Sequence, residues 1–182
     1  MADHIDLALL GVRVVVGVTL ALHGINKVRG GLAGTGRWFT GIGFRWGYPN
    51  AIVAATFEIG GGLFFALGLL TPLAAAAIVG LMVVALITSH WQVGFFVFRP
   101  NQGIEYVLVL AVAAIAVGTI GPGEWSLDKA FGIVESGYQT TWWGFVLSAG
   151  LGVVGALAQL AVCWKPPAGA LGWGSATKKK TS

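Results

Sequence analysis

The sequence predicts an all-α protein that crosses a membrane several times, and three observations favour this fold class. Hydrophobic residues make up 56% of the chain and charged residues only 10%, whereas soluble domains carry about 25% charged residues. The mean hydropathy is +0.81. Apolar blocks recur along the chain, and their lengths approach the roughly 20 residues that a helix needs to cross the hydrocarbon core. We therefore expect a polytopic membrane helix bundle.

Five apolar blocks are expected to form the membrane-spanning helices. They lie near residues 5–24, 51–70, 72–90, 104–121 and 142–164. The third and fourth hold only about 16–18 strongly apolar residues, which a bundle tolerates through local thinning of the bilayer. Thr71 and Pro72 separate the second block from the third, and they predict a tight helical hairpin.

The basic residues predict the orientation of the bundle. If all five blocks cross, only Lys129 falls on one side, and nine residues fall on the other: Lys27, Arg29, Arg37, Arg45, Arg99, Lys165, Lys178, Lys179 and Lys180. Positive charge accumulates in cytoplasmic loops. The N-terminus is therefore expected outside and the C-terminus in the cytoplasm, in a plasma membrane.

The basic character does not indicate nucleic-acid binding. The net charge is +4 and the isoelectric point is near 9.5, but the basic residues are scattered between apolar blocks instead of forming a patch on a polar domain. The expected partner is the lipid bilayer. The single cysteine, Cys163, excludes an internal disulfide and a multi-cysteine metal cluster.

The segment 36–46, in the first loop, mixes basic and aromatic residues. Arg37 and Arg45 alternate with Trp38, Phe39 and other aromatic residues, a composition typical of a helix that lies in the headgroup layer. A glycine-rich basic loop is the alternative. Near residues 121–136, Ser126 and Asp128 predict the start of a short helix on the outer surface.

Two charged residues lie inside the first two apolar blocks. Arg13 and Glu58 would each cost roughly 2.5–3.5 kcal/mol at the bilayer centre. At about 1.5 Å of rise per residue, Arg13 is expected about 16 Å and Glu58 about 10 Å from the inner end of its block. We therefore predict that Arg13 and Glu58 form an ion pair between the first and second membrane helices.

Other ionisable residues gather at the inner ends of the blocks. The predicted polar cluster, which opens toward the cytoplasm, consists of Arg13, His23, Lys27, Glu58, His90 and Glu105. The structural alternative is an ion pair that fixes helix register, with histidines that are merely solvated. The histidines and carboxylates come from four helices without HxxxH or ExxH spacing, so a di-metal site is not expected. Haem is not expected either, because His23 and His90 lie at the membrane edge instead of deep in the bundle.

The fifth block carries small residues at four-residue spacing, namely Gly144, Ser148, Gly152 and Ala156. Such a row allows close approach of another helix. It predicts docking of the fifth helix on the other four or on another protein. Whether copies of the chain form a homo-oligomer is a separate open alternative.

Three segments together resemble the DoxX family of small bacterial membrane proteins. They are ALLGVRVVVGVTLALHGINK, ATFEIGGGLFFALGLLTPLAA, and NQGIEYVLVL followed by GPGEWSLD. They cover about residues 7–130 and occur in the family's order. The resemblance implies a four-helix membrane domain over 1–135, to which this chain adds a transmembrane helix over 136–165 and a basic cytoplasmic tail over 166–182.

The resemblance also implies a link to redox chemistry. Related DoxD proteins are subunits of thiosulfate:quinone oxidoreductase, and some DoxX proteins associate with superoxide dismutase and a sulfurtransferase. It assigns no catalytic residue. The positions that match the family pattern are Arg13, His23, Lys27, Glu58, Gly61, Asn101, Gly103, Glu105, Ser126 and Asp128.

Three hypotheses of function follow. The first is an accessory or anchoring membrane subunit of a redox complex, with a protein partner at the cytoplasmic face. The second is a quinone-linked oxidoreductase subunit that acts on a small sulfur oxyanion. In it, Arg13 and Lys27 supply positive charge, and Glu58 or Glu105 moves protons. His23 or His90 forms a hydrogen bond to a quinone carbonyl. The third is a transporter or lipid-binding protein.

The sequence leaves open whether the chain is an enzyme. It contains no haem, flavin or iron–sulfur motif, so quinone reduction would need an electron source on a partner or a substrate that reduces the quinone directly.

Overall fold

The computed structural model describes residues 2–136 and 141–173, which form a bundle of helices without a β-strand. The helices are α1 (Ala2–Arg29), α2 (Leu32–Gly41), α3 (Gly47–Leu67), α4 (Thr71–Ala85), α5 (Glu105–Ile120), α6 (Leu127–Ala130), α7 (Thr141–Phe145) and α8 (Gly152–Cys163). A π-helical turn at Leu86–His90 and a 3₁₀ turn at Trp91–Val93 extend α4. A second π-helical turn, Val146–Leu151, joins α7 to α8.

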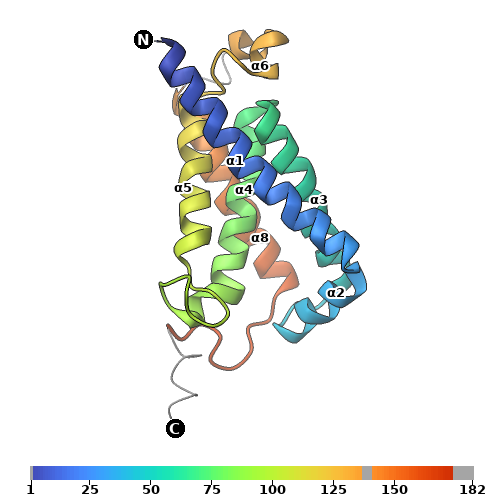
Figure 1. Cartoon of the computed structure of the whole chain (residues 1–182). Helices are drawn as coiled ribbons and strands as arrows, with labels where there is room; N and C mark the ends of the chain where they lie inside the picture. The colour runs from blue at the N-terminus through green and yellow to red at the C-terminus, as the bar shows by residue number, and fades with distance from the viewer. Residues whose placement is uncertain (1, 137–140, 174–182) are drawn as a thin grey trace.

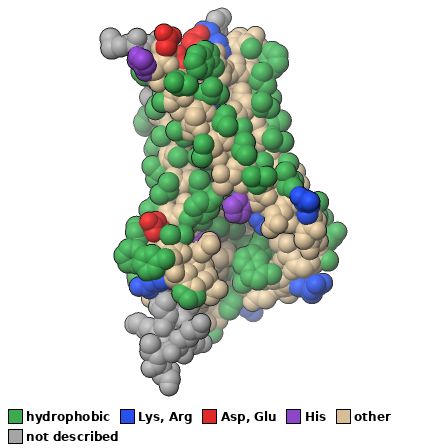
Figure 2. Space-filling model, viewed as in Figure 1, with side chains coloured by type: hydrophobic (Ala, Val, Ile, Leu, Met, Phe, Trp, Pro, Cys, Tyr) green, Lys and Arg blue, Asp and Glu red, His purple; other side chains and the backbone are tan. Residues whose placement is uncertain are grey.

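The five expected membrane helices are confirmed as helices. Four helical stretches are long and apolar enough to cross a membrane, namely Asp3–Arg29, Gly47–Leu67, Thr71–Val93 and Trp142–Cys163. The fourth block forms the shorter apolar helix α5, which has 16 residues. Figure 2 shows that the charged side chains on the visible face gather toward its two ends. The protein is therefore a multi-pass membrane protein.

The two ends of the bundle carry different elements (Figure 1). At one end, here named the outer end, α6 lies beside the start of α1, and at the opposite, inner end lie α2 and the segment between α4 and α5. The basic residues that were expected on the cytoplasmic side lie in these inner elements or next to them in the sequence. They are Lys27, Arg29, Arg37, Arg45, Arg99 and Lys165. Residues 178–180 lie outside the described residues.

Small residues bring α1 and α3 together in an antiparallel pair. A Cβ atom on Gly17 would collide with the carbonyl oxygen of Gly62, and one on Gly24 would lie 2.9 Å from the Cβ atom of Glu58. Only glycine allows helices to approach this closely. These contacts fix the register of the pair, so the level of each charged residue on α1 relative to α3 is set.

The small-residue row of the fifth membrane helix packs inside the molecule. Gly144 lies against the carbonyl oxygen of Gly118 in α5, and Gly152 lies against Ala76 and Val79 in α4. Ser148 is fully buried between these contacts. Of the alternatives for this row, docking on the other helices is therefore the one that the structure shows.

A helix predicted over 36–46 is present as α2, but its bounds differ. It begins earlier, at Leu32, and ends at Gly41. Gly43 has a φ of +102° and packs against the residues that follow α8, which leave no room for a side chain. The chain turns there, and Arg45 N donates to the carbonyl oxygen of Cys163 at 2.8 Å, which ties the end of α8 to the start of α3.

Candidate functional site at the inner end

A cavity of about 610 Å³ opens at the inner end of the bundle. Figure 1 shows α1 and α3 diverging from α4 and α5 toward this end, and Figure 2 shows a hollow there with a histidine at its edge. Leu20, Met82 and Val107 line the cavity and also belong to the apolar core of the bundle. The polar side chains that line the cavity are His23, Lys27, Glu58, Thr88, Ser89, His90, Gln92, Asn101, Gln102 and Tyr106.

Glu58 forms its ion pair with Lys27. Both carboxylate oxygens of Glu58 accept hydrogen bonds from the Lys27 ammonium group. Glu58 is buried, with 7% of its surface exposed, and Lys27 is half-buried at the last turn of α1. Each charge offsets the desolvation of the other. The pair lies on the wall of the cavity.

The predicted Arg13–Glu58 ion pair is wrong. Arg13 is 1% exposed, and its Nη2 atom donates to the carbonyl oxygen of Trp125 at 2.5 Å. It packs directly against Gly68, which follows α3 at the outer end. The register of α1 against α3 explains the error, because Gly17 packs on Gly62 and Gly24 packs on Glu58. Side chains on a helix lean toward its N-terminus, so Lys27 leans toward Glu58 and Arg13 leans away from it.

Asp128 is the acidic neighbour of Arg13, and it is fully buried. Its carboxylate accepts hydrogen bonds from Leu70 N at 2.7 Å, Thr71 N at 2.9 Å and Thr71 Oγ1 at 2.7 Å. The short helix α6 therefore caps the hairpin between α3 and α4. The expected cap at Ser126 is confirmed, because its hydroxyl accepts from Lys129 N at 3.2 Å.

The two histidines of the predicted cluster both line the cavity, and each donates to a backbone carbonyl. Nδ1 of His23 lies 2.9 Å from the Thr19 oxygen, and Nδ1 of His90 lies 2.8 Å from the Gln102 oxygen. A carbonyl oxygen only accepts, so Nδ1 carries the proton in each ring. The neutral imidazole then presents Nε2 as a hydrogen-bond acceptor.

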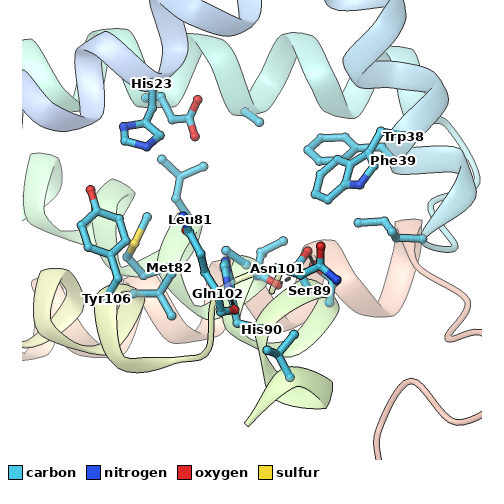
Figure 3. Close-up of a pocket in the computed structure, with 18 of the residues that line it drawn as sticks. His23, Trp38, Phe39, Leu81, Met82, Ser89, His90, Asn101, Gln102 and Tyr106 are labelled. Carbon is cyan, nitrogen blue, oxygen red and sulfur yellow. Dashed lines mark hydrogen bonds between the residues drawn. The ribbon is translucent and has the colours of Figure 1, made fainter. Parts of the chain in front are cut away.

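Aromatic side chains complete the cavity (Figure 3). Tyr106 from α5 lies beside His23, with ring centroids 6.2 Å apart, and Trp38 and Phe39 from α2 lie on the other side of the opening. The sequence interpretation placed Trp38 and Phe39 only at the membrane surface and missed Tyr106. A tyrosine at the start of an apolar helix was the available signal, since its hydroxyl needs a polar surrounding.

Glu105 does not line the cavity. Its carboxylate accepts from Val97 N at 3.1 Å, and it thereby holds the segment between α4 and α5. The structure thus brings together His23, Lys27, Glu58 and His90, and it places Arg13 and Glu105 elsewhere. Within the described residues, no group of three or more His, Cys, Asp or Glu side chains is arranged as a metal site.

Comparison with known proteins gives one similarity, to a family of membrane proteins. No curated protein and no solved structure matches the chain. The model of the DoxX family matches residues 8–91, a segment that runs from α1 through the turns after α4 and holds His23, Lys27, Glu58 and His90. It precedes α5 and the fifth membrane helix. The match covers a little less than half of the chain, and it shows that this segment is similar to the DoxX family.

Proposed function

We propose that this protein is a membrane subunit of a redox complex and that its inner cavity binds the head group of a quinone. The observation that carries the proposal is the cavity itself. Its volume of about 610 Å³ is within the roughly 300–1,000 Å³ of ligand sites, which combine apolar walls with a few polar groups. The similarity of residues 8–91 to the DoxX family, in which some proteins take part in redox complexes, supports the link to a redox complex.

The polar groups suit both redox forms of a quinone. The Tyr106 hydroxyl can donate to a quinone carbonyl, and Nε2 of His23 can accept from a quinol hydroxyl. The rings of Trp38 and Phe39 offer flat apolar surfaces to the head group. When bound, the quinone would supply the two-electron chemistry. The chain itself would orient the ring and receive a proton at His23.

A small sulfur oxyanion fits this cavity less well. Lys27 already pairs with Glu58, and Arg13 lies at the outer end against Trp125. The two cations expected to bind an anion therefore do not converge. The quinone half of the hypothesis keeps its support, whereas the oxyanion would have to bind on another subunit.

The hypothesis of an accessory or anchoring subunit loses one of the sequence features that supported it. The small-residue row of the fifth helix is covered by α4 and α5, so it offers no free surface to a partner. Because the sequence has no haem, flavin or iron–sulfur motif, we infer that electrons reach or leave the quinone through another protein or through a soluble reductant at the basic inner end.

Binding of a tailless dimethoxy-methyl-benzoquinone and of its quinol to the purified chain in nanodiscs tests the proposal. We expect saturable binding by isothermal titration calorimetry. Tyr106→Phe should weaken the quinone, and His23→Gln the quinol, by about three- to tenfold, the value of one net hydrogen bond. Tyr48→Phe and His4→Gln, which change exposed residues outside the cavity, are the matched controls. The absence of saturable binding, or equal effects of site and control variants, would refute the proposal.

A further inference from the structure

A second, apolar groove adjoins the inner cavity. It has a volume of about 500 Å³ and lies between α3, α4 and α8. Val53, Phe57, Leu73 and Leu151 line it, and each of them is at least 40% exposed. These helices cross the membrane, so the groove opens sideways toward the lipid.

The groove and the cavity share a wall. Phe39, Ala54, Leu81 and Val84 line both spaces, so a single layer of side chains separates them. Figure 3 shows Phe39 and Leu81, two side chains of this layer, at the cavity. Ala54 contributes only a methyl group. A molecule that passes between these side chains can occupy both spaces at once.

The two spaces differ in polarity. The polar side chains of the groove are the amides of Asn50 and Gln159, which bond to each other at 2.9 Å, and the thiol of Cys163. The groove therefore offers little to a polar ligand. Along α4 it extends from Leu73 to Val84, a length of roughly 16 Å at 1.5 Å of rise per residue.

We propose that the groove holds the apolar tail of the ligand whose head group occupies the inner cavity. The ligand class is then a membrane quinone with a long tail, which enters from the lipid between α3, α4 and α8. This inference rests on the proposed function and adds the path of the tail. Lipid chains are as apolar as the groove, so the groove contributes orientation more than affinity, and the test measures where the tail lies.

Gly155 allows the groove to be filled without disturbing the fold. It lines the groove and is exposed, and a Cβ atom there would meet no atom within 4 Å. The side chain in Gly155→Leu therefore enters open space. Gly11 is equally exposed and unobstructed but lies on α1, away from the groove. Gly11→Leu is the matched control.

The experiment uses a benzoquinone with a decyl tail that carries a photoreactive diazirine at its end, added to the full chain in nanodiscs. Mapping of the adducts by mass spectrometry should place them on α3, α4 and α8 at the groove. Excess tailless quinone should displace them, Gly155→Leu should abolish them, and Gly11→Leu should leave them unchanged. Tailless quinone should bind all three proteins equally.

The outcomes separate this inference from the proposed function. Adducts on α1 or α5, adducts that persist in Gly155→Leu, or adducts that excess tailless quinone does not displace would overturn the tail path, because they indicate another route or ordinary lipid-like occupancy. If the wild-type chain does not bind tailless quinone, the proposed function fails first.

Discussion

Lys27 and Glu58 have opposite charges and lie in a part of the bundle where either charge alone would lose much of its hydration without a partner. Their exposure is unequal, because 23% of the Lys27 side chain is exposed and only 10% of the Glu58 side chain. Lys27 sits at the end of α1, from which a long basic side chain can reach the interface. Glu58 is in the interior of α3 and has no such route.

This asymmetry predicts unequal effects of removing either partner. Lys27→Met should destabilise the protein by about 1–3 kcal/mol, because a buried carboxylate loses its counter-ion. Glu58→Gln should cost less, and the double variant should recover part of the loss, with a coupling energy of at least about 0.5 kcal/mol. Unfolding in SDS, followed by circular dichroism, measures these free energies. Additive effects of the two substitutions would contradict the pair.

Asp128 has a different role, since it holds the outer end together through three hydrogen bonds to Leu70 and Thr71. Asp128→Asn replaces one accepting oxygen by a donor that faces other donors. We expect a loss of about 1–3 kcal/mol in the free energy of unfolding, measured by the same unfolding assay. Asp3→Asn changes an exposed acid on α1, and it should change stability by less than about 0.5 kcal/mol. Similar values for both would remove the structural role of Asp128.

At the scale of elements, the fifth membrane helix belongs to the bundle. Gly152 on α8 lies 2.8 Å, measured from an ideal Cβ position, from both the Ala76 carbonyl oxygen and the Val79 Cβ atom. Gly155 on the same helix meets nothing within 4 Å. The two glycines therefore distinguish a packed face from an open one.

Gly152→Leu should destabilise the protein by about 1–3 kcal/mol or more, because a larger side chain must push α8 away from α4. Gly155→Leu should leave the melting temperature nearly unchanged. Thermal unfolding of both variants in the same detergent measures the difference. If Gly152→Leu melts like the parent protein, α8 does not pack as described.

The sequence predicted the helices well and the pairing of charges poorly. Hydropathy places five apolar blocks because the bilayer sets the length of a spanning helix. It does not show where a helix ends inside a polar loop, and α1 runs on to Arg29 while α3 begins already at Gly47. These two errors nearly cancel, so the wrong partner of Glu58 came from ignoring the direction in which side chains lean along a helix.

The register of α1 against α3 was present in the sequence in another form. Gly17 and Gly62, which pack against each other, would have aligned Arg13 with the end of α3 and Glu58 with Ala21. From there Lys27 leans toward Glu58, because side chains on a helix lean toward its N-terminus. Tyr106 and Asp128 were harder to place, because a cavity wall or a loop contact depends on helices that are distant in sequence. His23, Lys27, Glu58 and His90 were found because ionisable residues near apolar blocks are rare.

At the scale of the whole molecule, the charges of the described residues divide between the two ends. Arg29, Arg37 and Arg45 lie at the inner end, and Lys129 pairs with Glu124 at 3.3 Å at the outer end. The positive-inside rule then predicts that the cavity faces the cytoplasm. A quinone site on this side would exchange protons with the cytoplasm.

Cysteine accessibility tests this orientation, because Cys163 is the single cysteine of the chain and Cys163→Ser supplies a blank background. Asp3 at the outer end and Arg37 on α2 are both exposed. In intact spheroplasts, a membrane-impermeant maleimide should label Asp3→Cys fully and Arg37→Cys only after the membrane is permeabilised, because six of the described basic residues hold the α2 end inside. Labelling after permeabilisation controls for the reactivity of each site. The reverse labelling pattern would show that the cavity faces the outside of the cell. Any proton exchange at the cavity would then take place with that side of the membrane.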